Sequence, residues 1–150
     1  MLGTFKYAAN TSMVLGVSDQ ITSACAVLLP ANSSLDKILW NVNTQTGHIC
    51  LAESQDLVLG ISNKSISTGS LIVLQERNAN DQTQMWDMVS KSGFILSRAN
   101  PSYVIDDSAR GQAPNTKIQL YPFNGSPAQK WIFVPTSMMA AFLEEDSQTA

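Results

Sequence analysis

Short apolar runs alternate with clusters of polar and turn-forming residues along the whole chain. Within the runs, apolar and polar positions alternate or β-branched residues follow one another, which is typical of strands. Asn, Ser, Gly and Pro separate the runs, as they do at turns. In the last third of the chain this pattern predicts four strands, at residues 93–98, 103–106, 117–122 and 130–135. The pattern therefore predicts an all-β chain.

The three tryptophans of the chain are evenly spaced. Trp40, Trp86 and Trp131 are separated by 46 and 45 residues, and each lies among alternating apolar residues. Three further apolar segments begin 27, 29 and 28 residues before their own tryptophan, at Met13, Leu57 and Tyr103. A constant period of this length indicates an internal repeat, with each copy forming one structural unit.

Three repeats fill nearly the whole chain, at about residues 3–46, 47–91 and 92–136. A unit of four strands cannot bury its apolar face alone, so the three units must close on one another around a shared core. The predicted fold is an all-β β-trefoil of twelve strands in three pseudo-symmetric repeats, with the tryptophans in the core around the axis. Residues 1–136 are predicted to form this single domain.

Residues 137–150 fall outside the repeat. Met, Ala, Phe and Leu are followed there by Glu, Glu and Asp, which fits two helical turns without a capping residue. We interpret the segment as a C-terminal tail or as the stump of a linker to a further domain. A contact between two copies of the chain is a third interpretation.

Neutral polar groups must cover most of the surface, because only 14% of the residues are charged whereas Ser, Thr, Asn and Gln make up 48 of 150. The formal net charge is −3, and no basic cluster could neutralise several phosphates, which argues against nucleic acid as a partner. The longest apolar stretch, 24–30, is far shorter than the roughly 20 residues of a membrane-spanning helix, so no membrane insertion is expected. The first residues do not resemble a signal peptide. The protein is therefore expected in the cytoplasm, or outside the cell after export by a route that needs no signal peptide.

Few residues could support catalysis or hold a metal. The spacing of Cys25 and Cys50 fits neither a metal site nor a disulfide framework, and His48 is the one histidine. His48 and Cys50 could form a thiol–imidazole pair on one strand, but the plainer interpretation is a strand histidine beside a core cysteine. Asp106 and Asp107 are adjacent and should point apart, unlike the facing carboxylates of a glycosidase. The sequence predicts no enzyme, no metal site and no cofactor.

A Gln-x-Trp motif lies near the end of two repeats, at Gln84 and Gln129, and the first repeat has Ile38 in place of the glutamine. A threefold chain with this motif resembles the ricin-type β-trefoil lectin family over about residues 3–135. The resemblance implies that each repeat can bind one sugar. It would do so through an Asp at the end of the second strand, an aromatic residue just after the third strand and polar side chains near Gln-x-Trp.

The third repeat carries nearly all of these groups. Matched to the family pattern, the candidate carbohydrate-binding residues are Asp106, Gln119, Tyr121, Asn124 and Gln129. A carboxylate can accept hydrogen bonds from two sugar hydroxyls, and an aromatic face covers sugar C–H groups. Ala128 stands where many members have an asparagine, so one amide contact would be missing unless Asn124 supplies it. Other roles stay open: a turn carboxylate for Asp106, a half-buried rim position for Tyr121 and an orienting amide for Gln129.

The other two repeats lack both the carboxylate and the ring. The matching positions are Gly16 and Pro30 in the first repeat and Gly60 and Gln75 in the second. We therefore expect one competent site, in the third repeat, and a lectin that recognises galactose- or N-acetylgalactosamine-type glycans or glycoproteins. One shallow site binds a monosaccharide weakly, so a homo-oligomer would raise the useful affinity.

Two other classes of function also fit a trefoil. A protein-binding trefoil with decayed sugar sites, for example a protease inhibitor, would use loops such as 75–82 and would not depend on Asp106 or Tyr121. A targeting module of a larger toxin or hydrolase is a third class, for which the segment after Thr136 is the only hint.

Overall fold

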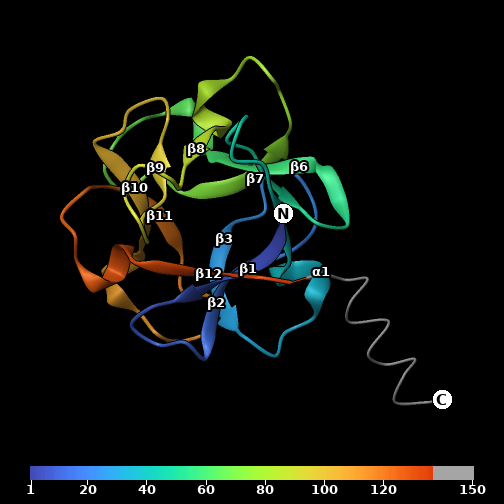
Figure 1. Ribbon diagram of the computed structural model, residues 1–150, viewed down its shortest axis with the longest axis vertical. Helices are drawn as coiled ribbons and strands as arrows, with labels where there is room; N and C mark the ends of the chain where they lie inside the picture. The colour runs from blue at the N-terminus through green and yellow to red at the C-terminus, as the bar shows by residue number, and fades with distance from the viewer. Residues whose placement is uncertain (137–150) are drawn as a thin grey trace.

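The computed structural model describes residues 1–136 and shows three similar lobes arranged around one axis (Figure 1). Each lobe contributes four strands, β1–β4, β5–β8 and β9–β12. The strands of the described residues are β1 Leu2–Tyr7, β2 Met13–Val17, β3 Ala26–Pro30, β4 Trp40–Val42, β5 Ile49–Leu51, β6 Ser54–Ile61, β7 Ile72–Glu76, β8 Trp86–Asp87, β9 Leu96–Ser97, β10 Tyr103–Asp107, β11 Ile118–Pro122 and β12 Trp131–Pro135. The predicted all-β class and the twelve strands in three groups are confirmed.

Short helical turns occupy equivalent places in the repeats. One turn precedes the last strand of each repeat, as α1 Leu35–Ile38, η2 Gln82–Gln84 and η4 Pro127–Gln129. Another follows the second strand in two repeats, as η1 Ser62–Lys64 and η3 Ser108–Arg110. No helix within residues 1–136 is long and apolar enough to cross a membrane. The prediction of a tail or linker stump at 137–150 lies outside the described residues.

One predicted strand is shorter than the sequence indicated. Residues 93–98 were expected to be extended, whereas β9 covers only Leu96–Ser97. Gly93 has a φ of 89°, and the N–H of Phe94 donates to the carbonyl of Lys91 at 3.0 Å, so the chain is still turning there. The apolar residues of this segment are therefore explained by the burial of Ile95 and Leu96 and not by a longer pairing with a neighbouring strand.

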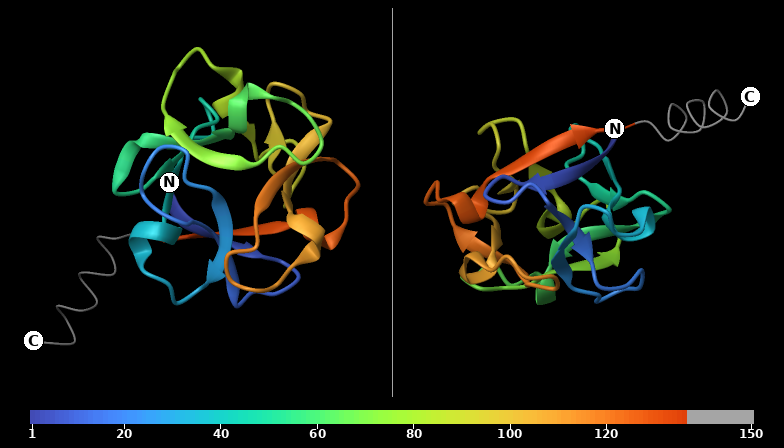
Figure 2. Two further views of the ribbon diagram at one scale, coloured as in Figure 1. Left: turned by 180° about the vertical axis from the view of Figure 1, so that it is seen from behind. Right: turned by 90° about the horizontal axis from the view of Figure 1, so that it is seen from below.

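Strands β1 and β12 close the structure. They are antiparallel neighbours over five residue pairs, from Gly3 opposite Pro135 to Tyr7 opposite Trp131, and they run side by side in Figure 2. β1 also pairs with β2 and β4, so strands from the first and third repeats share one sheet. The remaining strands of the third repeat form a second sheet with β8, in the order β11-β10-β9-β8.

Three fully buried leucines, Leu28, Leu74 and Leu120, link the repeats in a ring. Each exchanges two backbone hydrogen bonds with the loop before the third strand of another repeat. The N–H of Leu28 donates to the Thr116 carbonyl at 2.9 Å, and the Leu28 carbonyl accepts from the N–H of Asn115 at 2.7 Å. Leu74 makes the same two bonds with Ala24 and Ser23. Leu120 makes them with Ser70 and Gly69, and all four distances are between 2.7 and 2.9 Å. Every repeat is thereby hydrogen-bonded to both others.

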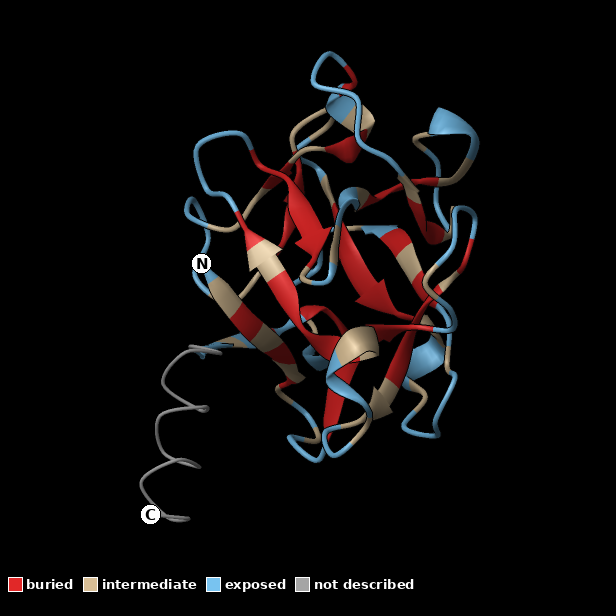
Figure 3. Cartoon of the chain, turned by 90° about the vertical axis from the view of Figure 1, so that its right-hand side faces the viewer, coloured by how far each residue is buried: buried red, intermediate tan, exposed pale blue. Residues whose placement is uncertain are grey.

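The three tryptophans lie in the common core, as predicted, with exposures of 0 to 3%. Buried strand segments surround this core, and the loops carry the exposed residues (Figure 3). Each indole Nε1–H also donates to a backbone carbonyl of the second strand in its own repeat, at Leu15 (3.0 Å), Leu59 (3.0 Å) and Ile105 (3.3 Å). Each of these residues directly precedes the position that was matched to the sugar-binding Asp, namely Gly16, Gly60 or Asp106. The core tryptophan of each repeat therefore holds in place the strand that carries this position.

The indole hydrogen bonds predict a large stability effect. Trp86→Phe should lower the free energy of unfolding by about 2–4 kcal/mol, because it leaves a cavity and removes the partner of the buried Leu59 carbonyl. Denaturant unfolding followed by far-UV circular dichroism measures this loss. Val89→Ala, at a side chain that is 72% exposed, is the control and should change stability by less than about 0.5 kcal/mol. A loss below about 1 kcal/mol in the tryptophan variant would contradict the structural role of the indole.

Candidate carbohydrate-binding site

The predicted site residues of the third repeat gather at one pocket of about 200 Å³. β10 and β11 form its floor, and the turns η3 and η4 form two of its sides. Four of the residues that line it were predicted from the sequence, namely Asp106, Gln119, Tyr121 and Asn124. The fifth, Gln129, is fully buried and reaches the pocket through Asp106.

Asp106 is the centre of the polar contacts. It lies opposite Gln119 in the β10–β11 ladder and is only 5% exposed. Its Oδ1 accepts a hydrogen bond from Gln119 Nε2 at 3.0 Å, and its Oδ2 accepts one from Gln129 Nε2 at 3.0 Å. Burial raises the pKa of Asp106, whereas the two amide donors and Arg110 lower it. Each oxygen keeps lone pairs that can accept from a ligand.

Both polar atoms of the Gln129 side chain are engaged. Its Nε2 donates to Asp106 Oδ2 and also to the Pro122 carbonyl at 2.9 Å. Its Oε1 accepts from the backbone N–H groups of Asn124 at 2.9 Å and Gly125 at 3.3 Å. The Gln of Gln-x-Trp therefore positions both the carboxylate and the loop after β11, which is the orienting role that the sequence left open.

Tyr121 and Asn124 form the accessible rim. Tyr121 lies opposite Val104 in the ladder and is 37% exposed. Asn124 is exposed, and its Oδ1 accepts from the N–H of Ser126 at 2.9 Å, so the loop turns back on itself beside the pocket. Ala128 also lines the pocket and is buried, and Asn124 lines the same pocket.

Arg110 and Asp107 also line the pocket, which the family pattern did not predict. Arg110 lines the pocket and follows Ala109, and both have left-handed backbone with φ of 56° and 53°. The equivalent residues of the second repeat, Asn63 and Lys64, have the same conformation with φ of 57° and 54°, so the turn after the second strand imposes it in both repeats. The sequence offers no signal for it in the third repeat, because neither Ala109 nor Arg110 favours this region.

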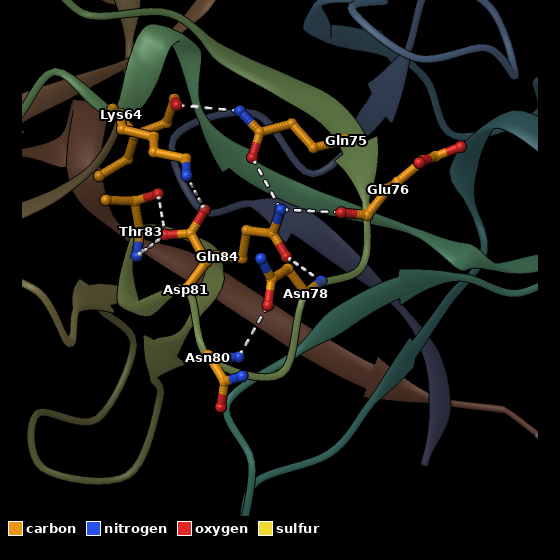
Figure 4. Close-up of polar contacts among 9 residues, drawn as sticks. Lys64, Gln75, Glu76, Asn78, Asn80, Asp81, Thr83 and Gln84 are labelled. Atoms are coloured by element: carbon orange, nitrogen blue, oxygen red, sulfur yellow. Dashed lines mark hydrogen bonds and ion pairs between the residues drawn. The ribbon is translucent and has the colours of Figure 1, made fainter.

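The second repeat has a similar glutamine network but no carboxylate at the position of Asp106; the nearby Asp81 carboxylate instead accepts from the Thr83 N–H and contacts Lys64 (Figure 4). Gln75 occupies the ladder position of Tyr121, yet its side chain folds back over Gly60, where a Cβ atom would lie 2.1 Å from Gln75 Oε1. Gln84 Nε2 donates to Gln75 Oε1 at 3.1 Å and to the Glu76 carbonyl at 2.9 Å, and Gln84 Oε1 accepts from the Asn78 N–H at 2.8 Å. An amide oxygen thus takes the place of the Asp106 carboxylate.

The first repeat has no room for a side chain at the same position. A Cβ atom on Gly16 would lie 2.7 Å from Leu29 Cδ1 and 2.9 Å from the Lys37 carbonyl. Ile38, which replaces the glutamine, is buried beside it. The match of Pro30 to the aromatic position was wrong: Leu29 holds the ladder position of Tyr121, because it lies opposite Val14 as Tyr121 lies opposite Val104. Apolar packing therefore occupies the space that Asp106 and Gln129 fill in the third repeat.

The chain matches no protein-family model, and no curated protein has a matching sequence. Solved structures do match its fold. A designed threefold-symmetric protein, ThreeFoil, superposes with a TM-score of 0.79 over 90% of this chain and 99% of its own, at 16% identity. The C-half of an earthworm R-type lectin, in complex with GalNAc, has a TM-score of 0.70 over 88% of this chain and 96% of its own, at 17% identity.

A mosquitocidal holotoxin contains a similar unit. It matches with a TM-score of 0.80 and 14% identity over 91% of this chain, which spans only 17% of the toxin chain. At these identities the likeness establishes the architecture and no more. The β-trefoil predicted from the Trp spacing, and its likeness in fold to the ricin-type lectins, are confirmed.

Asp107, a fully buried carboxyl group, lies beside Asp106 and also lines the pocket. The equivalent residues of the other repeats are Val17 and Ile61, which pair in the same ladder positions. Burial and the charge of Asp106 raise the pKa of Asp107 to about 7. The nearby Tyr7 hydroxyl acts in the opposite direction and lowers the pKa, although it forms no well-oriented hydrogen bond with the carboxyl group. Burial and Asp107 in turn raise the pKa of Tyr7 to about 12.

This environment predicts pH-dependent stability. The folded state favours protonated Asp107, so its stabilising effect is complete below about pH 4 and is lost as the pH rises through about 7. Asp107→Val should remove this loss and stabilise the protein increasingly from pH 5 to pH 8, by up to about 4 kcal/mol. Denaturant unfolding at both pH values measures the difference, with Asp56→Asn as an exposed control. Equal changes at pH 5 and pH 8 would show that Asp107 does not titrate with folding.

Proposed function

We propose that this protein is a non-enzymatic lectin that binds galactose- or N-acetylgalactosamine-type glycans in the pocket of the third repeat. The observation that carries the proposal is the carboxylate of Asp106, which two amide side chains hold at the floor of a pocket whose rim includes the exposed Tyr121. The complex of the earthworm R-type lectin fold with GalNAc supports this class of ligand.

The geometry suits a sugar with two neighbouring hydroxyls. Each Asp106 oxygen receives one amide hydrogen bond and can accept a second from a ligand hydroxyl. Bonds to a charged acceptor contribute about 1.5–3 kcal/mol each, compared with about 0.5–1.5 kcal/mol for neutral groups. Because Gln119 and Gln129 already hold the carboxylate, binding does not have to order it.

The ring of Tyr121 would cover the C–H face of the sugar, and Asn124 would supply the amide contact. The pocket is small and open, so a single monosaccharide should bind with a Kd near the millimolar range, about −4 kcal/mol. Stronger attachment would require an extended glycan or several copies of the chain, and we propose homo-oligomerisation as the route. A monomeric mass in sedimentation equilibrium would count against that part of the proposal.

The residues described here favour binding over catalysis. No group of three or more His, Cys, Asp or Glu within residues 1–136 is arranged to hold a metal ion. Asp106 and Asp107 occupy adjacent positions of β10; Asp106 contacts the two glutamines and Asp107 lies beside Tyr7. They therefore do not face each other across a cleft as the carboxylates of a glycosidase do.

A glycan array with the wild-type chain and two variants tests the proposal. Asp106→Asn should weaken binding to galactose-type or N-acetylgalactosamine-type termini at least about tenfold, because the charged acceptor is lost. Tyr121→Ala, at a partly exposed side chain, should weaken it several-fold without affecting folding. Asp19→Asn, on an exposed turn of the first repeat, is the matched control and should bind as wild type does.

Three results would change the conclusion. Undiminished binding by both site variants would place the glycan site elsewhere on the trefoil. Absence of glycan binding by folded wild-type protein would reject the lectin function and favour a trefoil that binds protein through its loops. Binding to other sugar types that still requires Asp106 would correct only the specificity.

A further inference from the structure

An apolar pocket of about 590 Å³ lies between β12 and residues 92–95, the segment before β9. Lys130 is the one charged residue in its lining, and no acidic residue lines it. It shares no lining residue with the third-repeat pocket. Apolar side chains that gather at an open pocket mark a surface for interaction. The seven apolar lining residues are Phe5, Met88, Phe94, Ile95, Trp131, Ile132 and Phe133.

The pocket is a gap between two segments that the first repeat joins through its backbone. There the N–H of Val42 donates to the Met1 carbonyl at 2.8 Å. Phe133 is the equivalent of Val42, since each lies two residues after the tryptophan of its repeat. The matching carbonyl of Lys91 instead accepts from the N–H of Phe94 at 3.0 Å, and among the described residues it receives no bond from Phe133. The third repeat therefore leaves this gap open.

Apolar side chains continue from the pocket along the exposed face of β12. Ile132 is 44% exposed and Val134 is 36% exposed. They alternate with Phe133, whose ring packs on Phe5 with the ring centroids 4.9 Å apart. Both faces of β12 thus carry apolar groups close to Thr136, where the described residues end.

Two lysines lie at the opposite end of the pocket, near the start of β12. Lys130 directly precedes the strand and lines the pocket. Lys91 directly precedes the lining residue Ser92, and its Nζ lies 4.9 Å from the ring centroid of Phe123. Both lysines are exposed, and neither forms an ion pair with a described residue. An acidic group would therefore be attracted to this end of the pocket.

The sequence after Thr136 has the same order of apolar and charged groups. Residues 138–143 read Met-Met-Ala-Ala-Phe-Leu, and residues 144–146 read Glu-Glu-Asp. In the two helical turns that this sequence fits, Met139, Phe142 and Leu143 share one face. A chain that returned along β12 would place its apolar residues at the pocket first and its acidic residues at the lysines next.

The segment is also long enough to return. Phe133 lies four residues before residue 137, and each residue spans at most about 3.3–3.6 Å. A chain that reverses at residues 137–138 therefore comes back to the level of Phe133 within about four or five residues. Phe142 is four residues beyond Met138, at the position where the pocket would receive it.

We propose that residues 138–146 fold back along β12, with Phe142 and Leu143 in this pocket and the acidic residues beside Lys130 and Lys91. Docking removes apolar surface from water on both the segment and the pocket. The covalent connection through Thr136 keeps the segment at a high effective concentration beside the pocket. For this reason the occupant is the chain's own segment and not that of a second copy.

Met88 lines the pocket, so its methyl NMR signal reports whether the pocket is covered. The full chain is compared with Phe142→Ser in the presence of a soluble paramagnetic agent, which broadens the signals of solvent-accessible groups. Phe142→Ser should increase the broadening of the Met88 methyl signal several-fold, because the pocket opens to water. Met138→Ser makes a similar change at the point of reversal and is the matched control, which should behave as wild type does. Both substitutions lie outside the described fold of residues 1–136.

Nuclear Overhauser contacts identify the occupant. In the wild-type chain the ring of Phe142 should contact the rings of Phe94 and Phe133. A sample that mixes labelled and unlabelled chains should show that these contacts arise within one chain. Contacts that arise only between chains would overturn the proposal and assign the pocket to the segment of a second copy. Absence of the contacts, or equal broadening of the Met88 signal in wild type and Phe142→Ser, would overturn it as well.

Discussion

The ring of backbone hydrogen bonds at Leu28, Leu74 and Leu120 is the constraint on which the rest of the structure depends. Each leucine satisfies its donor and its acceptor on a loop of another repeat, so no repeat completes its own hydrogen bonding. Buried backbone groups must be paired, and the three repeats can pair them only in this closed arrangement. The tryptophans lie in the same core cluster as these leucines and hold the second strand of each repeat through Nε1. The candidate sites follow directly after these strand positions.

The backbone symmetry contrasts with differences in side chains at the three equivalent sites. The third repeat has Asp106 held by Gln129, the second has Gln75 held by Gln84, and the first has Leu29 and Ile38 in apolar contact near Gly16. The main chain keeps the same course in each case, because the ladder and the indole bond fix it. Binding chemistry can therefore change in one repeat while the neighbouring repeats keep the fold.

Much of the fold could be predicted from sequence because it depends on residues that repeat. The spacing of Trp40, Trp86 and Trp131 reflects one core, and short apolar runs reflect strands such as β2, of which every residue is buried. The grouping of Asp106, Gln119 and Tyr121 was implied by the resemblance to the lectin family, and the structure places the three residues on two paired strands. The fold of Gln75 over Gly60 and the buried state of Asp107 could not be predicted. Each arises from contacts between segments far apart in the chain or from a side-chain direction that the pattern does not encode.

The pairing of β1 with β12 also affects how the chain reaches its native state. Gly3 and Pro135 lie opposite each other, although nearly the whole described chain separates them. Pairings between distant segments form slowly, since the entropy of closing a long loop must be overcome before any contact forms. During synthesis, β1 cannot pair with β12 until β12 has emerged from the ribosome. Until then its unpaired edge is open to other chains, which makes this interval the one in which misassembly competes with folding.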